Sequence, residues 1–352
     1  MTTFGHDDGA PTGTGPIDAV IAWVDGADPA HAARRALHRG EAESSFSDAV
    51  LPTRFADCGE VYACIASILK FAPWMRRIWL LTDQQRPALL GSFAAEGLCA
   101  PDRIAVVDHR EAFRGYEHLL PTFNSLSIGA VLWRIEGLAE RFVYFNDDVF
   151  LNRPAVPEDF FRDGAALVHA RSPGAASRLA RRLRQLARRA RGLPPDPRTS
   201  LKRAAEISAA LAGRPARVLQ PAHQPHPMRR SPLAAFHERR PEVLEAQLSF
   251  RFRNAAQFLP SALSYQLELE ATGGPVRPMP ELAYLNGATV RTAEEARAIL
   301  GDETAPFACL QSLDLAPEEV RREVAAMLAR RYGSHLPGPV LGRLAALEDA
   351  AP

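Results

Sequence analysis

Four short apolar runs in the first half of the chain each stop at a polar residue, as strands of an α/β protein do. The runs are Ile17–Val24, Ile78–Leu81, Ile104–Val107 and Arg141–Phe145, and their length and boundaries predict buried strands. Apolar residues at helical spacing predict helices between them, at about Pro29–Glu43, Cys58–Phe71 and Ser125–Leu138. This alternation predicts an α/β fold with a mostly parallel sheet and helices on both faces.

The polar residues that follow these strands are expected to lie close together. The carboxyl ends of parallel strands meet at one edge of the sheet, and ligands bind there in open α/β folds. The residues concerned are Asp25, Asp83, Asp108, His109, Asn146, Asp147 and Asp148. The pattern alone therefore predicts a largely acidic binding edge.

An arginine-rich segment, residues 171–215, interrupts this pattern. Seven arginines fall between residues 178 and 191, and Leu179, Leu183 and Leu186 repeat at helical spacing, which predicts a basic amphipathic helix. Prolines at 194, 195 and 197 then break the helix. We interpret the segment as a helical insertion. Its role stays open between a solvated hairpin, packing on the protein's own core, and docking to an acceptor or a membrane.

The rest of the chain is expected to form one domain around this insertion. Apolar spacing predicts further helices at about Pro241–Ser249, Ser261–Thr272 and Pro317–Tyr332. The expected organisation is a disordered tail over 1–16, an α/β domain over 17–335 that contains the insertion, and a C-terminal tail over 336–352.

Composition narrows the class of protein. The chain has 352 residues, of which 47% are hydrophobic, and a net charge of +1; it can bury a large core and lacks the basic field of a nucleic-acid binder. Its four cysteines show no CxxC spacing, which indicates reduced thiols. No apolar run resembles a signal peptide or a membrane span. We expect a cytoplasmic protein, with peripheral contact at the inner membrane face through residues 171–215 as an option.

The segment Asn146-Asp147-Asp148 is the first candidate for chemistry. Adjacent carboxylates repel each other, so their ionised form needs a cation or solvent. At the end of a buried strand, Asp147 and Asp148 could bind Mg²⁺, although a solvated turn gives the same pattern. Asp25-Gly26 also follows a strand. Gly26 would let the backbone approach a ligand, but a tight turn is the better explanation of this motif on its own.

Two motifs in the second half add a candidate base and candidate phosphate ligands. His223 and His226 lie between prolines in HQPHP; a neutral histidine could accept a proton, a charged one could bind phosphate, and a zinc site or a surface loop are the alternatives. Arg251 and Arg253 alternate in RFRN, and their guanidinium groups could hold phosphate oxygens in pairs. In a chain so rich in arginine, ordinary surface charge is the alternative.

Taken together, these segments resemble the Stealth family of sugar-phosphotransferases. That family includes bacterial capsule-polymer transferases and the catalytic subunit of the lysosomal-enzyme N-acetylglucosamine-1-phosphotransferase. The resemblance begins at IDAVIAWVDGADP and continues, in the family's order, through RFADCGE, FAPWMRRIWLLTDQQRP, VDH, LPTFNS and YFNDD to HQPHP and RFRN. It covers residues 17 to 335 apart from the arginine-rich insertion.

The resemblance implies a reaction and a set of residues for it. A hexose-1-phosphate, for example N-acetylglucosamine-1-phosphate, would pass from a nucleotide-sugar, expected to be a UDP-sugar, to a hydroxyl of a glycan or polysaccharide, and a nucleoside monophosphate would leave. The fold would be that of a nucleotide-sugar transferase. His223, Asp148 and Arg253 would be catalytic, and Asp147 and Asp148 would bind Mg²⁺ or Mn²⁺. The expected substrate-binding residues are Asp25, Gly26, Arg54, Asp83, Asn124, Ser125, Asn146 and Arg251.

Two departures from the family pattern concern the same site. The family often has an arginine where this chain has Ala66, and its late Asn-Asp pair is absent from FACLQSLD, Phe307 to Asp314. Asp314 is a candidate substitute. Two rival functions remain at this level: a metal-dependent glycosyltransferase, which would release a nucleoside diphosphate, and a non-enzymatic protein that binds polyanions.

Overall fold

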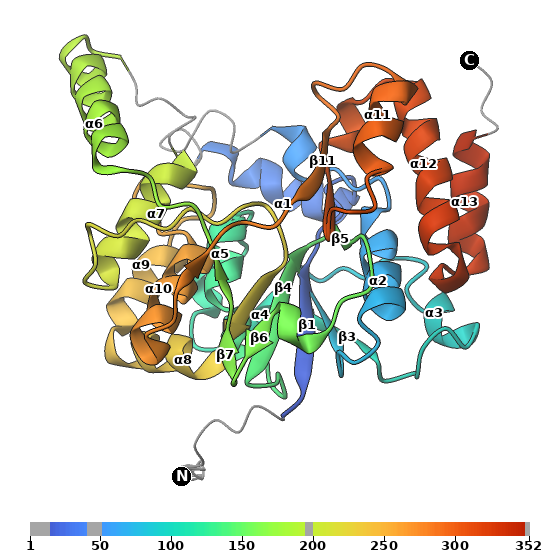
Figure 1. Ribbon diagram of the computed structural model, residues 1–352, viewed down its shortest axis with the longest axis horizontal. Helices are drawn as coiled ribbons and strands as arrows, with labels where there is room; N and C mark the ends of the chain where they lie inside the picture. Colours follow the sequence, from blue (N-terminus) through green and yellow to red (C-terminus); the bar gives the residue numbers. More distant parts are fainter. Residues whose placement is uncertain (1–14, 41–50, 194–199, 349–352) are drawn as a thin grey trace.

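The computed structural model describes residues 15–40, 51–193 and 200–348. A five-stranded sheet lies at the centre of the molecule (Figure 1). Nearly all of the expected N-terminal tail lies outside these residues. The strand order is β3-β2-β1-β4-β9. The first four strands are parallel, and β9 runs antiparallel to β4. Their bounds are β1 Ile17–Ala22, β2 Ile78–Thr82, β3 Ile104–Asp108, β4 Arg141–Asn146 and β9 His226–Arg229.

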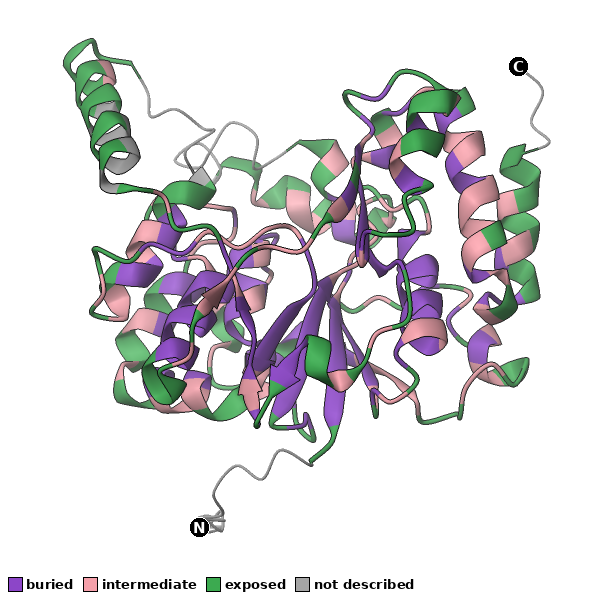
Figure 2. Cartoon of the chain, viewed as in Figure 1, coloured by how far each residue is buried: buried purple, intermediate pink, exposed green. Residues whose placement is uncertain are grey.

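Helices cover both faces of this sheet, as predicted. Alternate residues of β1 show why: Ile17, Ala19 and Ile21 face one apolar cluster, whereas Val20 faces the other. β1, β2 and β4 are accordingly buried along almost their whole length (Figure 2). On the first face the clusters include α2 Glu60–Phe71, α3 Ser92–Ala95, α11 Ala293–Leu300, α12 Glu318–Tyr332 and α13 Gly338–Glu348. On the second they include α4 His109–Ala112, α5 Ser125–Ala130, α8 Arg230–Arg239, α9 Pro241–Leu248 and α10 Pro260–Thr272.

One carboxylate, Asp18, ties β1 to its neighbours from inside the protein. It is fully buried and accepts hydrogen bonds from Arg76 at 2.6 and 2.9 Å, from the indole N–H of Trp79 at 2.9 Å and from the backbone N–H of Ala139 at 2.9 Å. A buried charge is tolerated when it is paired and hydrogen-bonded in this way. Asp18 therefore fixes the start of β1, at the end of the strand opposite Asp25.

A second, three-stranded sheet continues directly from β4. Its order is β11-β12-β5, with β11 at Leu282–Asn286, β12 at Phe307–Gln311 and β5 at Val149–Leu151. β5 pairs antiparallel with β12. The two residues between β4 and β5 are Asp147 and Asp148, so this acidic turn joins the two sheets. Short pairs of strands, β6 Phe161–Arg162 with β7 Ala165–Ala166, and β8 Val168–His169 with β10 Val276–Arg277, lie outside both sheets.

Three of the sequence-based boundaries need correction. The helix expected at Ser125–Leu138 stops at Ala130, where the indole N–H of Trp133 donates to the Ala130 carbonyl at 3.0 Å and replaces a helical partner. The helix expected at Pro29–Glu43 is α1, Pro29–Leu37. The expected C-terminal tail is wrong for 338–348, because these residues form α13, whose Val340 is buried in the first apolar cluster.

The arginine-rich insertion consists of two different helices. α6, Ala175–Ala190, is exposed and projects from the molecule, at the upper left of Figure 1. α7, Ser200–Leu211, instead buries Ala205 and Ala209 against Ala262 of α10. The insertion is therefore helical as predicted, but its second helix is part of the core. No helix in the described part of the chain is both long and apolar enough to cross a bilayer.

Candidate active site

The acidic turn after β4 is held rigidly by both sheets. Asn146, the last residue of β4, is paired with Ala22 of β1. On the other side, the backbone N–H of Leu310 in β12 donates to the carbonyl of Asp148 at 2.9 Å. Backbone contacts therefore fix the turn before any side chain contributes, which is the preorganisation that a catalytic group needs.

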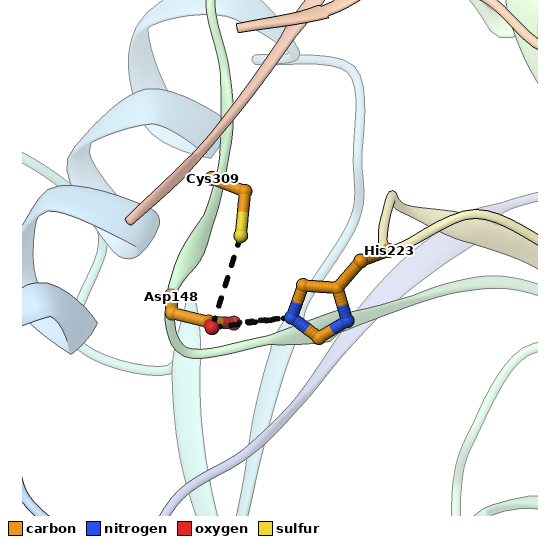
Figure 3. Close-up of side chains that lie close together, drawn as sticks. All are labelled: Asp148, His223 and Cys309. Atoms are coloured by element: carbon orange, nitrogen blue, oxygen red, sulfur yellow. Dashed lines mark hydrogen bonds and ion pairs between the residues drawn. The ribbon is translucent and has the colours of Figure 1, made fainter. Parts of the chain in front are cut away.

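His223 lies directly against Asp148 (Figure 3). Its Nε2 is 3.1 Å from both carboxylate oxygens of Asp148, and the amide nitrogen of Asn146 lies 3.3 Å from both ring nitrogens. The hydroxyl of Tyr144 donates to Asn146 Oδ1 at 2.6 Å and so orients that amide. Burial alone would lower the pKa of His223, but the charge of Asp148 and its hydrogen bond outweigh burial, and the net pKa is raised.

Cys309 of β12 completes a group of three around Asp148, a contact that the sequence did not indicate. Its Sγ lies 3.8 Å from Asp148 Oδ2 (Figure 3). Burial, followed by the charge of Asp148, raises the pKa of the thiol, so Cys309 stays protonated and donates to the carboxylate. Among the described residues, one ligand atom each from Asp148, His223 and Cys309 lie within 4.8 Å of one another, which is close enough to share a metal ion.

More carboxylates surround this group than the strand-end pattern indicated. Burial raises the pKa of Asp147 strongly, and the charges of Asp148, Glu60 and Asp57 raise it further. Burial also raises the pKa of Glu60 to about 8, with Asp57 and Asp148 adding to it. Glu60 is the first residue of α2, and Asp57 lies three residues before it in the RFADCGE segment. That segment supported the family resemblance, but neither residue was assigned a role from it.

Arg253 provides positive charge beside the histidine. Its guanidinium donates to the hydroxyl of Ser125 at 2.5 and 3.2 Å, and its charge acts to lower the pKa of His223. The structure thus brings Arg253 and Ser125 to the same edge as Asn146, Asp147, Asp148 and His223. Asp25 belongs to this edge as well, because it follows the carboxyl end of β1, which pairs with β4.

Two conserved regions of a known protein family match this chain. The model of Stealth conserved region 1 matches residues 15–40, and that of conserved region 2 matches residues 54–168. An exopolysaccharide phosphotransferase of Streptomyces coelicolor is 36% identical over 92% of this chain and 56% of its own length. A capsular polysaccharide phosphotransferase of Actinobacillus pleuropneumoniae is 38% identical over 42% of this chain and 38% of its own.

The chain belongs to the Stealth family. It spans about half the length of the first curated relatives that it matches, 56% and 52%. The solved structure of the bifunctional glycosyltransferase WbbM aligns with 94% of this chain and 51% of its own, at a TM-score of 0.46 and 10% sequence identity.

Some residues that the Stealth resemblance marked as substrate-binding have structural contacts instead. Asn124 is fully buried; it caps α5 through Leu126 N–H at 3.0 Å and donates to Phe250 O and Gln257 Oε1. Arg251 donates to the carbonyls of Leu119 and Pro121, at 3.0 and 3.2 Å. These contacts hold the LPTFNS loop in place, so both residues stabilise the loop that carries Ser125.

Two further predicted substrate-binding residues at the strand ends, Gly26 and Asp83, also contact other parts of the protein. A side chain at Gly26 would meet the backbone oxygen of Phe55 at 2.4 Å, so the close approach that this glycine permits is to the protein's own chain. Asp83 is buried and pairs with Arg34 at 2.8 Å. Burial would raise the pKa of Asp83, but the Arg34 hydrogen bond and charge help to bring it below its usual value. Arg54 is exposed on the short 3₁₀ helix Pro52–Arg54, just before α2.

The structure also places the second histidine of HQPHP, His226, and the two positions that depart from the Stealth pattern, Ala66 and Asp314. His226 is buried, its Nδ1 lies 3.1 Å from the hydroxyl of Tyr265, and burial lowers its pKa to about 3. Ala66 is fully buried in α2 within the apolar core. Asp314 accepts a hydrogen bond from Thr53 Oγ1 at 2.7 Å, and its charge contributes to the raised pKa of Cys58, next to Asp57.

Proposed function

We propose that this Stealth protein transfers a hexose-1-phosphate from a nucleotide-sugar, such as a UDP-sugar, to a hydroxyl of a glycan, with release of a nucleoside monophosphate. Its role would be in exopolysaccharide or capsule synthesis, in line with the names of its relatives. The observation that carries the proposal is the pair formed by His223 and Asp148 at the carboxyl end of β4. The proposal is further supported by the carboxylates and Arg253 that lie at the same edge of the sheet as this pair.

The carboxylates fit a hard divalent cation, Mg²⁺ or Mn²⁺. Oxygen donors are the ligands that these ions prefer, and Asp147 and Asp148 would hold the ion, with Glu60 and Asp57 adding negative charge behind them. When bound, the ion would neutralise the diphosphate of the donor and the phosphate that leaves. Burial raises the pKa of Asp147 most, and the like charges of Asp148, Glu60 and Asp57, which a cation would offset, raise it further.

His223 is suited to remove the proton of the acceptor hydroxyl. If Nε2 carries the proton and donates it to Asp148, Nδ1 is the nitrogen that accepts the new proton. Asp148 then stabilises the charged ring that forms, as a carboxylate does beside a catalytic histidine. Asn146, held by Tyr144, keeps the ring in this orientation.

Arg253 is proposed to bind a phosphate oxygen of the donor. Replacing it with lysine tests whether the paired N–H donors of its planar guanidinium group are needed. Lysine keeps the charge but loses paired N–H donors. We expect Arg253→Lys to raise the KM for the nucleotide-sugar about tenfold, since one charge-assisted hydrogen bond contributes roughly 1.5–3 kcal/mol. Arg251→Lys is the matched control, because Arg251 contacts backbone carbonyls instead. Unchanged kinetics in Arg253→Lys would reduce Arg253 to ordinary surface charge.

The proposed reaction is tested by the identity of the released nucleotide. The chain is incubated with a panel of nucleotide-sugars, Mg²⁺ and a glycan acceptor, and the nucleotide products are separated by ion-exchange chromatography. A nucleoside monophosphate that appears with sugar-phosphate on the acceptor supports the proposal. A nucleoside diphosphate would instead identify a glycosyltransferase, and no product with any donor would contradict both reactions.

A further inference from the structure

Helix α6 is the largest feature that the proposed reaction leaves unexplained. Residues 175–190 contain six arginines and no acidic residue. The helix projects from the body of the protein, and those of its residues whose side chains the structure describes are exposed, apart from the half-buried Arg188 (Figures 1 and 2). A solvated helix of this kind would be expected to show polar residues on all sides.

The exposed surface of α6 is instead divided into an apolar and a basic face. Leu179, Leu183 and Leu186 are 58%, 57% and 61% exposed, and at 3.6 residues per turn they fall within an arc of roughly 60°. Ala190 falls within the same arc and Ala176 and Ala187 border it, whereas Arg184, Arg188 and Arg189 fall outside it. Because the leucines are exposed, α6 does not pack them on the protein's own core, and the apolar face has no partner within the described part of the chain.

We propose that α6 docks on an anionic lipid surface, with its leucine face in the membrane interface and its arginines among the lipid phosphates. A basic helix with a separate apolar face lies in the plane of such an interface, and arginines close to it are attracted by anionic headgroups. A soluble polyanion would use the arginines but leave the leucines in water. A second copy of the helix would bury the leucines but bring two sets of arginines together.

The base of the insertion connects this surface to the active site. Arg171 and Gln220 form an antiparallel pair, with backbone hydrogen bonds of 3.0 and 2.9 Å between them. Gln220 lies three residues before His223. Docking through α6 would therefore hold the catalytic histidine near the lipid surface, although the docking itself does not depend on the proposed transferase reaction.

The test is co-sedimentation of the full chain with vesicles. One set consists of phosphatidylcholine alone, and the other also contains about one third phosphatidylglycerol. We expect the native chain to sediment with the anionic vesicles only, and to be released as salt rises, because screening weakens attraction over roughly 8–10 Å. Two triple variants separate the contributions: Leu179, Leu183 and Leu186 to serine, and Arg184, Arg188 and Arg189 to glutamine. Each is expected to lower the bound fraction at least tenfold.

A matched control uses three exposed leucines away from α6, Leu37, Leu315 and Leu347, changed to serine together. It should bind like the native chain, and thermal melting should show that all variants are folded. The proposal is overturned if the native chain stays in solution, or if the α6 leucine variant binds as well as the control. Light scattering that shows a dimer, lost in the leucine variant, without vesicle binding would identify a second copy as the occupant and would equally overturn it.

Discussion

Replacing His223 with alanine is expected to lower the rate of transfer by about 10²–10⁴-fold, the usual contribution of a general base. Donor binding should remain measurable by calorimetry, because in the proposed mechanism His223 acts on the acceptor hydroxyl. His118→Ala is a suitable control, since His118 is exposed on a separate 3₁₀ helix. If donor affinity and turnover fall together in His223→Ala, His223 is a phosphate ligand and its role as base is wrong.

The same role predicts the direction of the pH dependence. A base must be deprotonated, and the pKa of His223 is raised above its ordinary value of 6.5 by Asp148. Activity should therefore be full at pH values above this raised pKa and decline as the pH falls through it. A profile of kcat/KM whose acid limb lies below pH 6.5 would contradict the pairing of His223 with Asp148 in the working enzyme.

Changing Asp148 to asparagine is expected to have a comparably large effect, a loss of about 10³-fold in transfer. The variant loses a charged ligand of the proposed cation and the anionic partner of His223, and loss of one electrostatic stabiliser of a transition state typically costs about 10²–10³-fold. Chelation with EDTA should stop the native enzyme as completely. Mn²⁺ binding, followed by electron paramagnetic resonance, gives a readout apart from activity and should be lost in Asp148→Asn. Turnover that survives both EDTA and this substitution would contradict the metal site.

Thermal stability shows whether Asp148→Asn acts on the fold. Burial, and after it the charge of Asp148, raises the pKa of Asp147, and the charge of Asp148 also adds to the raised pKa of Glu60. Removing the charge of Asp148 should therefore leave the melting temperature unchanged or raise it. Asp102→Asn provides a control, because the side chain of Asp102 is 80% exposed and only loosely paired with Arg77. A large fall in melting temperature for Asp148→Asn would mean that the activity loss cannot be assigned to chemistry.

The sequence predicted the first half of the fold well because each of its parallel strands is a buried apolar run with a polar end. β1, β2, β3 and β4 all begin where they were expected. The strands of the second sheet gave no such signal. β5 has three residues, directly after the acidic turn, and neither β11 nor β12 stood out from the helices around it. Tertiary pairing determines these strands more than local pattern does.

The candidate site was predicted in its position but not in all its members. A strand end fixes where a residue lies, which is why Asp148 and Asn146 were found. A strand end does not fix where a side chain points. Asn124 and Asp83 turn inwards and bind Gln257 and Arg34. Cys309 lies in a segment that was considered only for its missing Asn-Asp pair, yet its thiol contacts Asp148. Glu60 was missed because its proximity depends on how α2 packs against the sheet.

The span of chain that the site requires has a consequence for how the protein is made. Asp148 meets His223 across 75 residues and Cys309 across 161. During synthesis the N-terminal part of a chain is available to fold first, and the four parallel strands are complete once Asn146 has emerged. At that stage the acidic turn has neither its histidine nor the β12 backbone that fixes it. Residues up to Cys309 must therefore have left the ribosome before the proposed site can assemble, and fragments that end before this residue would keep the four parallel strands but lack part of that site.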